Sequence, residues 1–298
     1  MNVEVQKQTL LLNENYEFIF GGVVLHYIVG YSGFNLEFES LDHHVREISI
    51  DVRSSNKQGQ KVTVKPHLVL CDHHTSHKTS GASKIDIVVL AIIGQDNPNL
   101  FIRSHYIIDG LKYIPENDIT FFKTALSYSN VEYEIDEDHH VQKFLSYIYP
   151  SIKSSVIEIK TGTSIIDREL NFIRGETSGS VIYYVGNDKN ILCAEYNSKK
   201  IGKSGQVSFG MAPENFSPDN YIVASFISEF SLSFDKPNDH HVKKLEVSSS
   251  FQDLYLNNGE INTRVNLKSY ITDRHYTEFD IPHNEVSGFL IAIKKNVI

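Results

Sequence analysis

The sequence predicts an all-β protein built from three tandem, internally repeated antiparallel β-sandwich domains. Three observations predict this fold class. A polar motif recurs about every hundred residues, apolar and polar residues alternate on both sides of each copy, and helical periodicity is scarce. The 298 residues accommodate three such units, because a domain of about 100 residues buries a core of its own.

The recurring motif is the tripeptide Asp-His-His, followed each time by valine. The second histidines of successive copies lie 96 and 101 residues apart. The three copies are Asp42-His43-His44, Asp138-His139-His140 and Asp239-His240-His241. We expect each copy to be a structural corner between two strands, in which the aspartate accepts hydrogen bonds from nearby backbone N–H groups and one histidine packs inward.

Four landmarks surround each copy in the same order. An alternating apolar run comes first, and its period of two residues predicts a strand with one buried face. A second strand follows the motif, a third run ends in aspartate, and a continuous apolar segment closes the unit. The first runs are residues 34–38, 131–135 and 230–234, the aspartates are Asp72, Asp167 and Asp273, and the last segments are residues 87–92, 181–185 and 289–293. We therefore place the units at residues 1–100, 101–205 and 206–298.

Glycine and asparagine mark the turns between these strands. Asn257-Asn258-Gly259 predicts a tight hairpin in the third unit. The first unit is expected to carry an extra N-terminal hairpin, residues 16–31, that turns at Gly21-Gly22. Residues 189–220 contain several glycines and prolines and are expected to be a connector.

Charge and composition exclude some classes of partner. The formal net charge is −9, and no basic stripe is present to displace the counterions of a nucleic acid. No run approaches the roughly 20 apolar residues that cross a bilayer, and residues 1–15 are too polar for a secretory signal. We expect a soluble protein made in the cytoplasm without membrane insertion. Release by lysis or by a dedicated machine stays open.

A fourth Asp-His-His triplet lies in the richest cluster of metal-ligand residue types. Asp72, His74 and His77 are the candidate metal ligands there, with Cys71 as an alternative to Asp72. The favoured interpretation is an exposed polar loop, so no cofactor is expected. At the three repeated motifs, adjacent histidines on an extended strand point to opposite faces and cannot both bind one ion.

Two enzyme families share short sequence features with the chain. A phosphoesterase family is named for the Asp-His-His motif, but it requires further aspartates on an α/β scaffold, which a strand-rich repeat does not offer. Residues 175–180 resemble the nucleophile loop of chymotrypsin-like proteases. That resemblance implies Ser178 as nucleophile, His139 or His140 as base, and Asp167 or Asp136 as acid. Serine-glycine pairs recur in the other units, which favours a hairpin turn instead.

These observations favour a non-enzymatic structural or interaction protein. Its modules would serve assembly or docking in a larger complex, such as a phage-tail-, toxin- or injection-machine-like component, through protein partners or self-association. The first alternative is a carbohydrate-binding module array, because repetition gives avidity and sixteen tyrosines offer stacking faces, although tryptophan is absent. The strand order is similar to that of small β-sandwich lectins in apolar spacing only. The second alternative is a metal-dependent or serine hydrolase.

Overall fold

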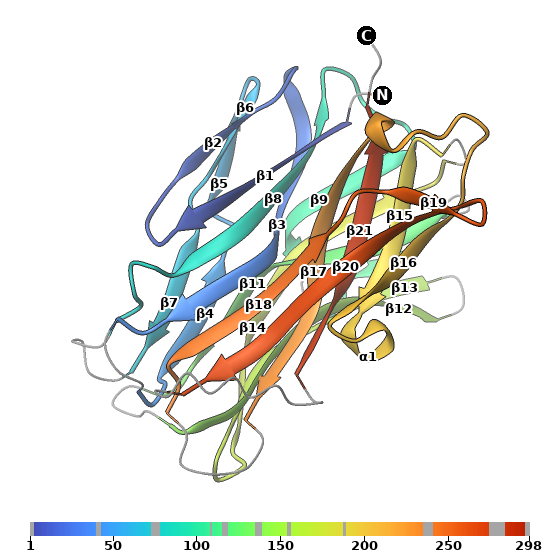
Figure 1. The fold of residues 1–298 in the computed structure, drawn as a ribbon. Coiled ribbons are helices and arrows are strands. Elements are labelled where there is room, and N and C mark those ends of the chain that lie inside the picture. Colours follow the sequence, from blue (N-terminus) through green and yellow to red (C-terminus); the bar gives the residue numbers. More distant parts are fainter. Residues whose placement is uncertain are drawn as a thin grey trace.

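The computed structural model describes residues 3–39, 43–72, 78–107, 109–114, 119–134, 139–153, 156–186, 189–234, 241–273 and 284–295. The prediction of an all-β, antiparallel protein is confirmed (Figure 1). Within the described ranges the helical elements are α1 (Ser198–Ile201) and the 3-10 turn η1 (Pro218–Asn220). Neither of them has the length or the apolar character that a membrane span needs.

The strands, in chain order, are β1 (Val3–Leu11), β2 (Tyr16–Ile19), β3 (Val24–Glu37), β4 (Glu47–Asp51), β5 (Ser55–Gln58), β6 (Lys61–Val64), β7 (His67–Cys71), β8 (Lys84–Ile93), β9 (Leu100–Ile107), β10 (Lys112–Tyr113), β11 (Phe121–Glu132), β12 (Val141–Lys153), β13 (Val156–Asp167), β14 (Phe172–Tyr184), β15 (Ile191–Asn197), β16 (Ser204–Met211), β17 (Tyr221–Ser233), β18 (Lys244–Phe251), β19 (Tyr255–Asn257), β20 (Glu260–Thr272) and β21 (Glu285–Lys294). They form three sheets. The first has the order β1-β8-β3-β18-β20-β16, with β19 on β20. The second has the order β15-β21-β17-β12-β13-β14-β11-β4-β7, with β9 on β14 and β10 on β13, and the third is β2-β6-β5.

The strands around the three motifs pair in a cyclic order. β4, which follows the first motif, pairs with β11, which precedes the second. β12, which follows the second, pairs with β17, which precedes the third. β18, which follows the third, pairs with β3, which precedes the first. These pairings join segments on opposite sides of the predicted unit boundaries. The division into three self-contained sandwiches therefore stays a prediction.

The buried core is continuous across these pairings. Residues that face each other across the three pairs are wholly buried, and they are Ile48 with Val131, Phe144 with Leu232, and Leu245 with Leu36. At the centre, the Phe230 ring packs edge-on against both Phe34 and Phe144, with ring centroids 5.2 Å apart in each case. One apolar cluster thus includes side chains from all three predicted units.

Local turn chemistry is confirmed at one hairpin. Asn257 lies opposite Glu260, while Asn258 and Gly259 have φ angles of 52° and 79°. These positive angles are the ones that a two-residue type I′ turn requires. Two other expectations differ from the structure. β2 pairs with β6 rather than with β3. The expected connector, residues 189–220, contains β15 and β16, which pair with β21 and β20.

The serine-glycine pairs also differ from the expected turns. Gly81 does lie in a turn, but Gly179 and Gly288 lie inside β14 and β21, opposite β-bulges in β11 and β17. A Cβ atom at Gly179 would lie 2.3 Å from the Ala125 carbonyl oxygen, and one at Gly288 would lie 2.0 Å from that of Phe226. These glycines therefore admit the close approach of a neighbouring strand.

Candidate functional site

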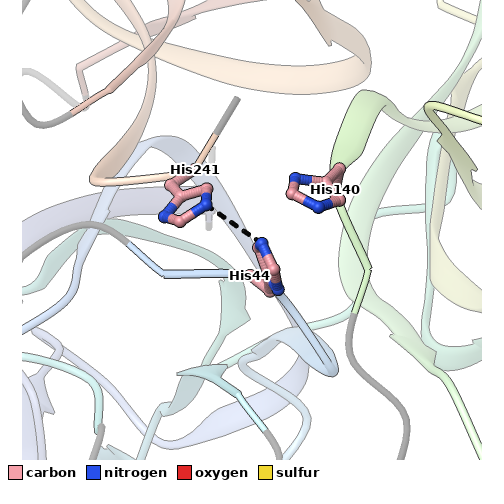
Figure 2. Close-up of side chains that lie close together, drawn as sticks. All are labelled: His44, His140 and His241. Atoms are coloured by element: carbon pink, nitrogen blue, oxygen red, sulfur yellow. Dashed lines mark hydrogen bonds between the residues drawn. The ribbon is translucent and has the colours of Figure 1, made fainter. Parts of the chain in front are cut away.

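The second histidine of each repeated motif reaches the same place in the molecule (Figure 2). His44, His140 and His241, hereafter the histidine triad, each offer a ring nitrogen within 4.8 Å of the others. The Nε2 atoms of His44 and His241 are 3.0 Å apart and share a hydrogen bond. The His44 ring centroid lies 3.8 Å from that of His140 and 4.4 Å from that of His241. All three side chains are half-buried, so the triad faces both the protein and solvent.

Backbone hydrogen bonds on both sides of His44 hold the triad together. His43 and Val242 exchange N–H to carbonyl bonds of 3.0 and 2.9 Å, and Val45 and His139 exchange two bonds of 3.0 Å. The residue before His44 is thus paired beside His241, and the residue after it is paired beside His140. Consecutive side chains on extended backbone point to opposite faces. The His44 ring therefore points to the face opposite the side chains of His43 and Val45, and on that face it meets His140 and His241.

The first histidine of each described motif lies beside an aspartate. His43 Nδ1 is 3.5 Å from the Asp72 carboxylate, and His139 Nδ1 is 3.2 Å from that of Asp167. Both aspartates end the third strand of their predicted unit and are buried. Asp167 also accepts hydrogen bonds from the Asn171 backbone N–H and side-chain amide, at 2.7 and 2.9 Å. These contacts separate the roles of the two adjacent histidines, because the first packs on an aspartate and the second enters the triad.

Several predicted site residues lie outside the described ranges. They are Asp42, Asp136, Asp138, Asp239, His240, His74 and His77. The proposed ligand set Asp72, His74 and His77 therefore stays a prediction, with Asp72 placed beside His43. Its neighbour Cys71 is half-buried, and burial together with the nearby Glu47 carboxylate raises the pKa of this thiol to about 11.

Ser178, the nucleophile implied by the protease resemblance, lies within β14 opposite Tyr128. It is buried, and its hydroxyl has no hydrogen-bond partner in the part of the chain that the structure describes. A serine nucleophile needs a base within hydrogen-bond reach. The geometry of the described residues does not supply one.

A second group of metal-ligand types lies next to the triad. His139, Asp167 and Glu169 offer atoms within 4.8 Å of one another. Both Asp167 oxygens already accept hydrogen bonds from Asn171, whereas the triad is made only of imidazoles. Imidazole nitrogens bind zinc and neighbouring transition metals, and three of them leave one tetrahedral position open.

Two clefts lie at matching places between strands. The first, of about 430 Å³, lies between β1, β8 and β18, and there Thr9 donates a hydrogen bond to Asp86 across 2.6 Å. The second, of about 330 Å³, lies between β15, β21 and β12, and there Asn197 donates to Ser287 across 2.9 Å. Thr9 and Asp86 are register partners, as are Asn197 and Ser287. Each cleft is thus lined by a hydrogen-bonded polar pair and by a strand that follows a motif, β18 in the first cleft and β12 in the second.

Comparisons with known proteins add little to this geometry. No protein-family model matches the chain, and no curated protein matches it. A solved structure, the penton protein of mavirus, shows 10 % sequence identity over 99 % of this chain and 100 % of that chain, with a TM-score of 0.15. A similarity at this level carries no argument about fold or function.

Proposed function

We propose that the chain is a non-enzymatic structural and interaction protein, made of three repeated β modules that close on one another and serve assembly or docking in a larger complex. The observation that carries the proposal is the cyclic pairing of β4 with β11, β12 with β17 and β18 with β3. Each module pairs with each of its two neighbours through a strand that lies next to a motif. A chain organised in this way forms a single body, which suits a building block of an assembly.

Backbone hydrogen bonds beside the motifs support the three-fold repetition. β3, β11 and β17 are the strands that precede the three motifs. The residue after each of them donates its backbone N–H to the carbonyl of the residue two positions after a histidine of the triad. These bonds run from Phe38 to Lys243 at 3.1 Å, from Tyr133 to Arg46 at 2.9 Å and from Phe234 to Gln142 at 3.0 Å. Phe38, Tyr133 and Phe234 are all buried. Equivalent positions therefore make equivalent contacts, as three copies of one module would.

Light scattering of the purified full chain tests the assembly role. Because association depends on concentration, the mass should be followed over about two orders of magnitude in protein concentration. We expect a defined oligomer or particle to form as concentration rises, and electron microscopy should show one repeating form. A monomer throughout, combined with turnover of a hydrolase substrate panel that Ser178→Ala abolishes, would refute the proposal.

Carbohydrate binding is a second candidate, supported by the two matching clefts. The first contains Phe251 beside the Thr9–Asp86 pair, and the second contains the half-exposed Tyr149. An aromatic face with a few fixed polar groups is a common design of small-ligand sites. Two such clefts on one chain would bind a multivalent glycan with avidity.

A glycan array distinguishes this second candidate from the first. Binding that weakens in Asp86→Ala and in Ser287→Ala, with the surface variant Lys61→Ala unaffected, would support a lectin-like role. Lys61 pairs with Glu17 on the separate three-stranded sheet and lines neither cleft. An array with no bound glycan would remove the candidate.

A further inference from the structure

We propose that the histidine triad binds one transition-metal ion, of the chemical class of zinc, and that this ion links the three repeated motifs. The inference goes beyond the structural role proposed above, which rests on strand pairing and needs no metal. Three different segments each supply one ligand, from positions 96 and 101 residues apart in the sequence. A bound ion would therefore cross-link the chain at three distant points.

The distances suit a common coordination sphere. Zinc binds imidazole nitrogen at 2.0–2.1 Å, so two ligands on a tetrahedral ion lie about 3.3 Å apart. The Nε2 atoms of His44 and His241 are already 3.0 Å apart. All ligand nitrogens lie within 4.8 Å of one another, so each longer separation has to shorten by no more than about 1.5 Å to reach the tetrahedral value.

The backbone around the triad is fixed before any ion binds. Reciprocal hydrogen bonds join His43 to Val242 and Val45 to His139, on the two sides of His44. Val45 and Val242 are fully buried in the core. Because the fold already orders these residues, binding would not have to order them again. The side chains are half-buried, which leaves a route for an ion from solvent.

The donor set determines which ions fit. Calcium and magnesium prefer oxygen ligands, whereas imidazole suits zinc, copper, nickel and iron. The triad consists of three nitrogen donors, and neither a carboxylate nor a thiol belongs to it. In the metal-free protein, one Nε2 of the His44–His241 pair donates its proton to the other. A metal ion would replace that shared proton with a coordinate bond to each nitrogen.

Metal binding to the untagged full chain tests the proposal. The chain is stripped with chelator and then titrated with Zn²⁺, with stoichiometry measured by native mass spectrometry and affinity by competition with a chromophoric chelator. We expect one ion per chain. His44→Ala, His140→Ala and His241→Ala should each weaken Zn²⁺ binding at least about tenfold, since each removes one of the ligands that define the site.

Two control variants make the test specific. His67→Ala removes an exposed histidine on β7 that lies outside the triad and should leave the affinity unchanged. His74→Ala removes a ligand of the competing set Asp72, His74 and His77, and should also leave it unchanged. Loss of binding in His74→Ala with retention in the three triad variants would overturn the proposal.

X-ray absorption on the unsubstituted, zinc-loaded chain covers the case in which a triad variant does not fold. We expect three imidazole ligands with nitrogen at about 2.0–2.1 Å and an oxygen completing the shell. Fewer imidazoles, or a sulfur ligand, would contradict the assignment. Light scattering with and without Zn²⁺ separates this proposal from the structural role, because assembly that persists in the stripped protein leaves that role intact even if no ion binds.

Discussion

Phe230 provides the sharpest test of a core shared by all three predicted units. Its ring is wholly buried and packs against Phe34 and Phe144, so its contacts cross two of the predicted unit boundaries. Truncating a buried phenylalanine to alanine costs about 3–5 kcal/mol, and two aromatic contacts favour the upper half of that range. For a chain of 298 residues, a loss of 4 kcal/mol corresponds to a melting temperature lower by about 6 °C.

Urea unfolding measures the effect directly. Tyrosine fluorescence and far-ultraviolet circular dichroism are the suitable probes, because the chain has no tryptophan. We expect one cooperative transition in the unsubstituted protein, shifted as a whole by Phe230→Ala and by about 1–2 kcal/mol in Phe230→Leu, which keeps more of the volume. The half-exposed Phe172 supplies a control, and Phe172→Ala should stay within about 0.5 kcal/mol. Several separate transitions, of which Phe230→Ala moves only one, would refute a shared core.

Three further predictions follow from single contacts. Burial raises the pKa of the Cys193 thiol to about 12. Iodoacetamide should therefore label this thiol slowly in the folded chain at pH 8, and faster as the pH rises toward the pKa. Labelling of the folded chain that is as fast as labelling of the urea-unfolded chain would contradict this prediction. Asp167→Ala should lower the free energy of unfolding by about 2–3 kcal/mol in a urea titration, because it removes a buried carboxylate that accepts two hydrogen bonds; an unchanged midpoint would show that the corner does not depend on it. Gly288→Ala should lower the free energy of unfolding by more than about 2 kcal/mol, since the added Cβ would lie 2.0 Å from a carbonyl oxygen. Gly81→Ala, where the added Cβ has open space, should change that free energy by less than about 0.5 kcal/mol. Equal urea midpoints for the two variants would argue against the close approach of the strands at Gly288.

Local patterns predicted much of the secondary structure. Alternation of apolar residues located the strands around each motif, because a period of two residues is a property of the strand itself. The turn at Asn258 and Gly259 followed from local chemistry in the same way. The same alternation does not specify a partner, since it gives the buried face of a strand and not its neighbour. The pairings of β2 with β6 and of β18 with β3 therefore had no local signal.

The histidine triad shows the same division between local and long-range information. The rule that adjacent side chains point to opposite faces separates the first histidine from the second within each motif. The contacts of His43 and His139 with aspartates, and of His44 and His140 with each other, are consistent with this rule. The meeting of His44, His140 and His241 depends on the cyclic strand pairing, which joins residues about two hundred positions apart. The threefold recurrence of the motif was the one sequence signal that pointed to it.

The cyclic strand order bears on how freely this chain can be rearranged. Since β18 pairs with β3 as β4 pairs with β11, the first and last predicted units are strand neighbours just as the first and second are. The start of β1 and the end of β21 lie at the same end of the molecule (Figure 1). A circular permutant that joins these ends and opens between β8 and β9 would retain every strand neighbour. The order of the strands along the chain could therefore be changed without changing which strands pair.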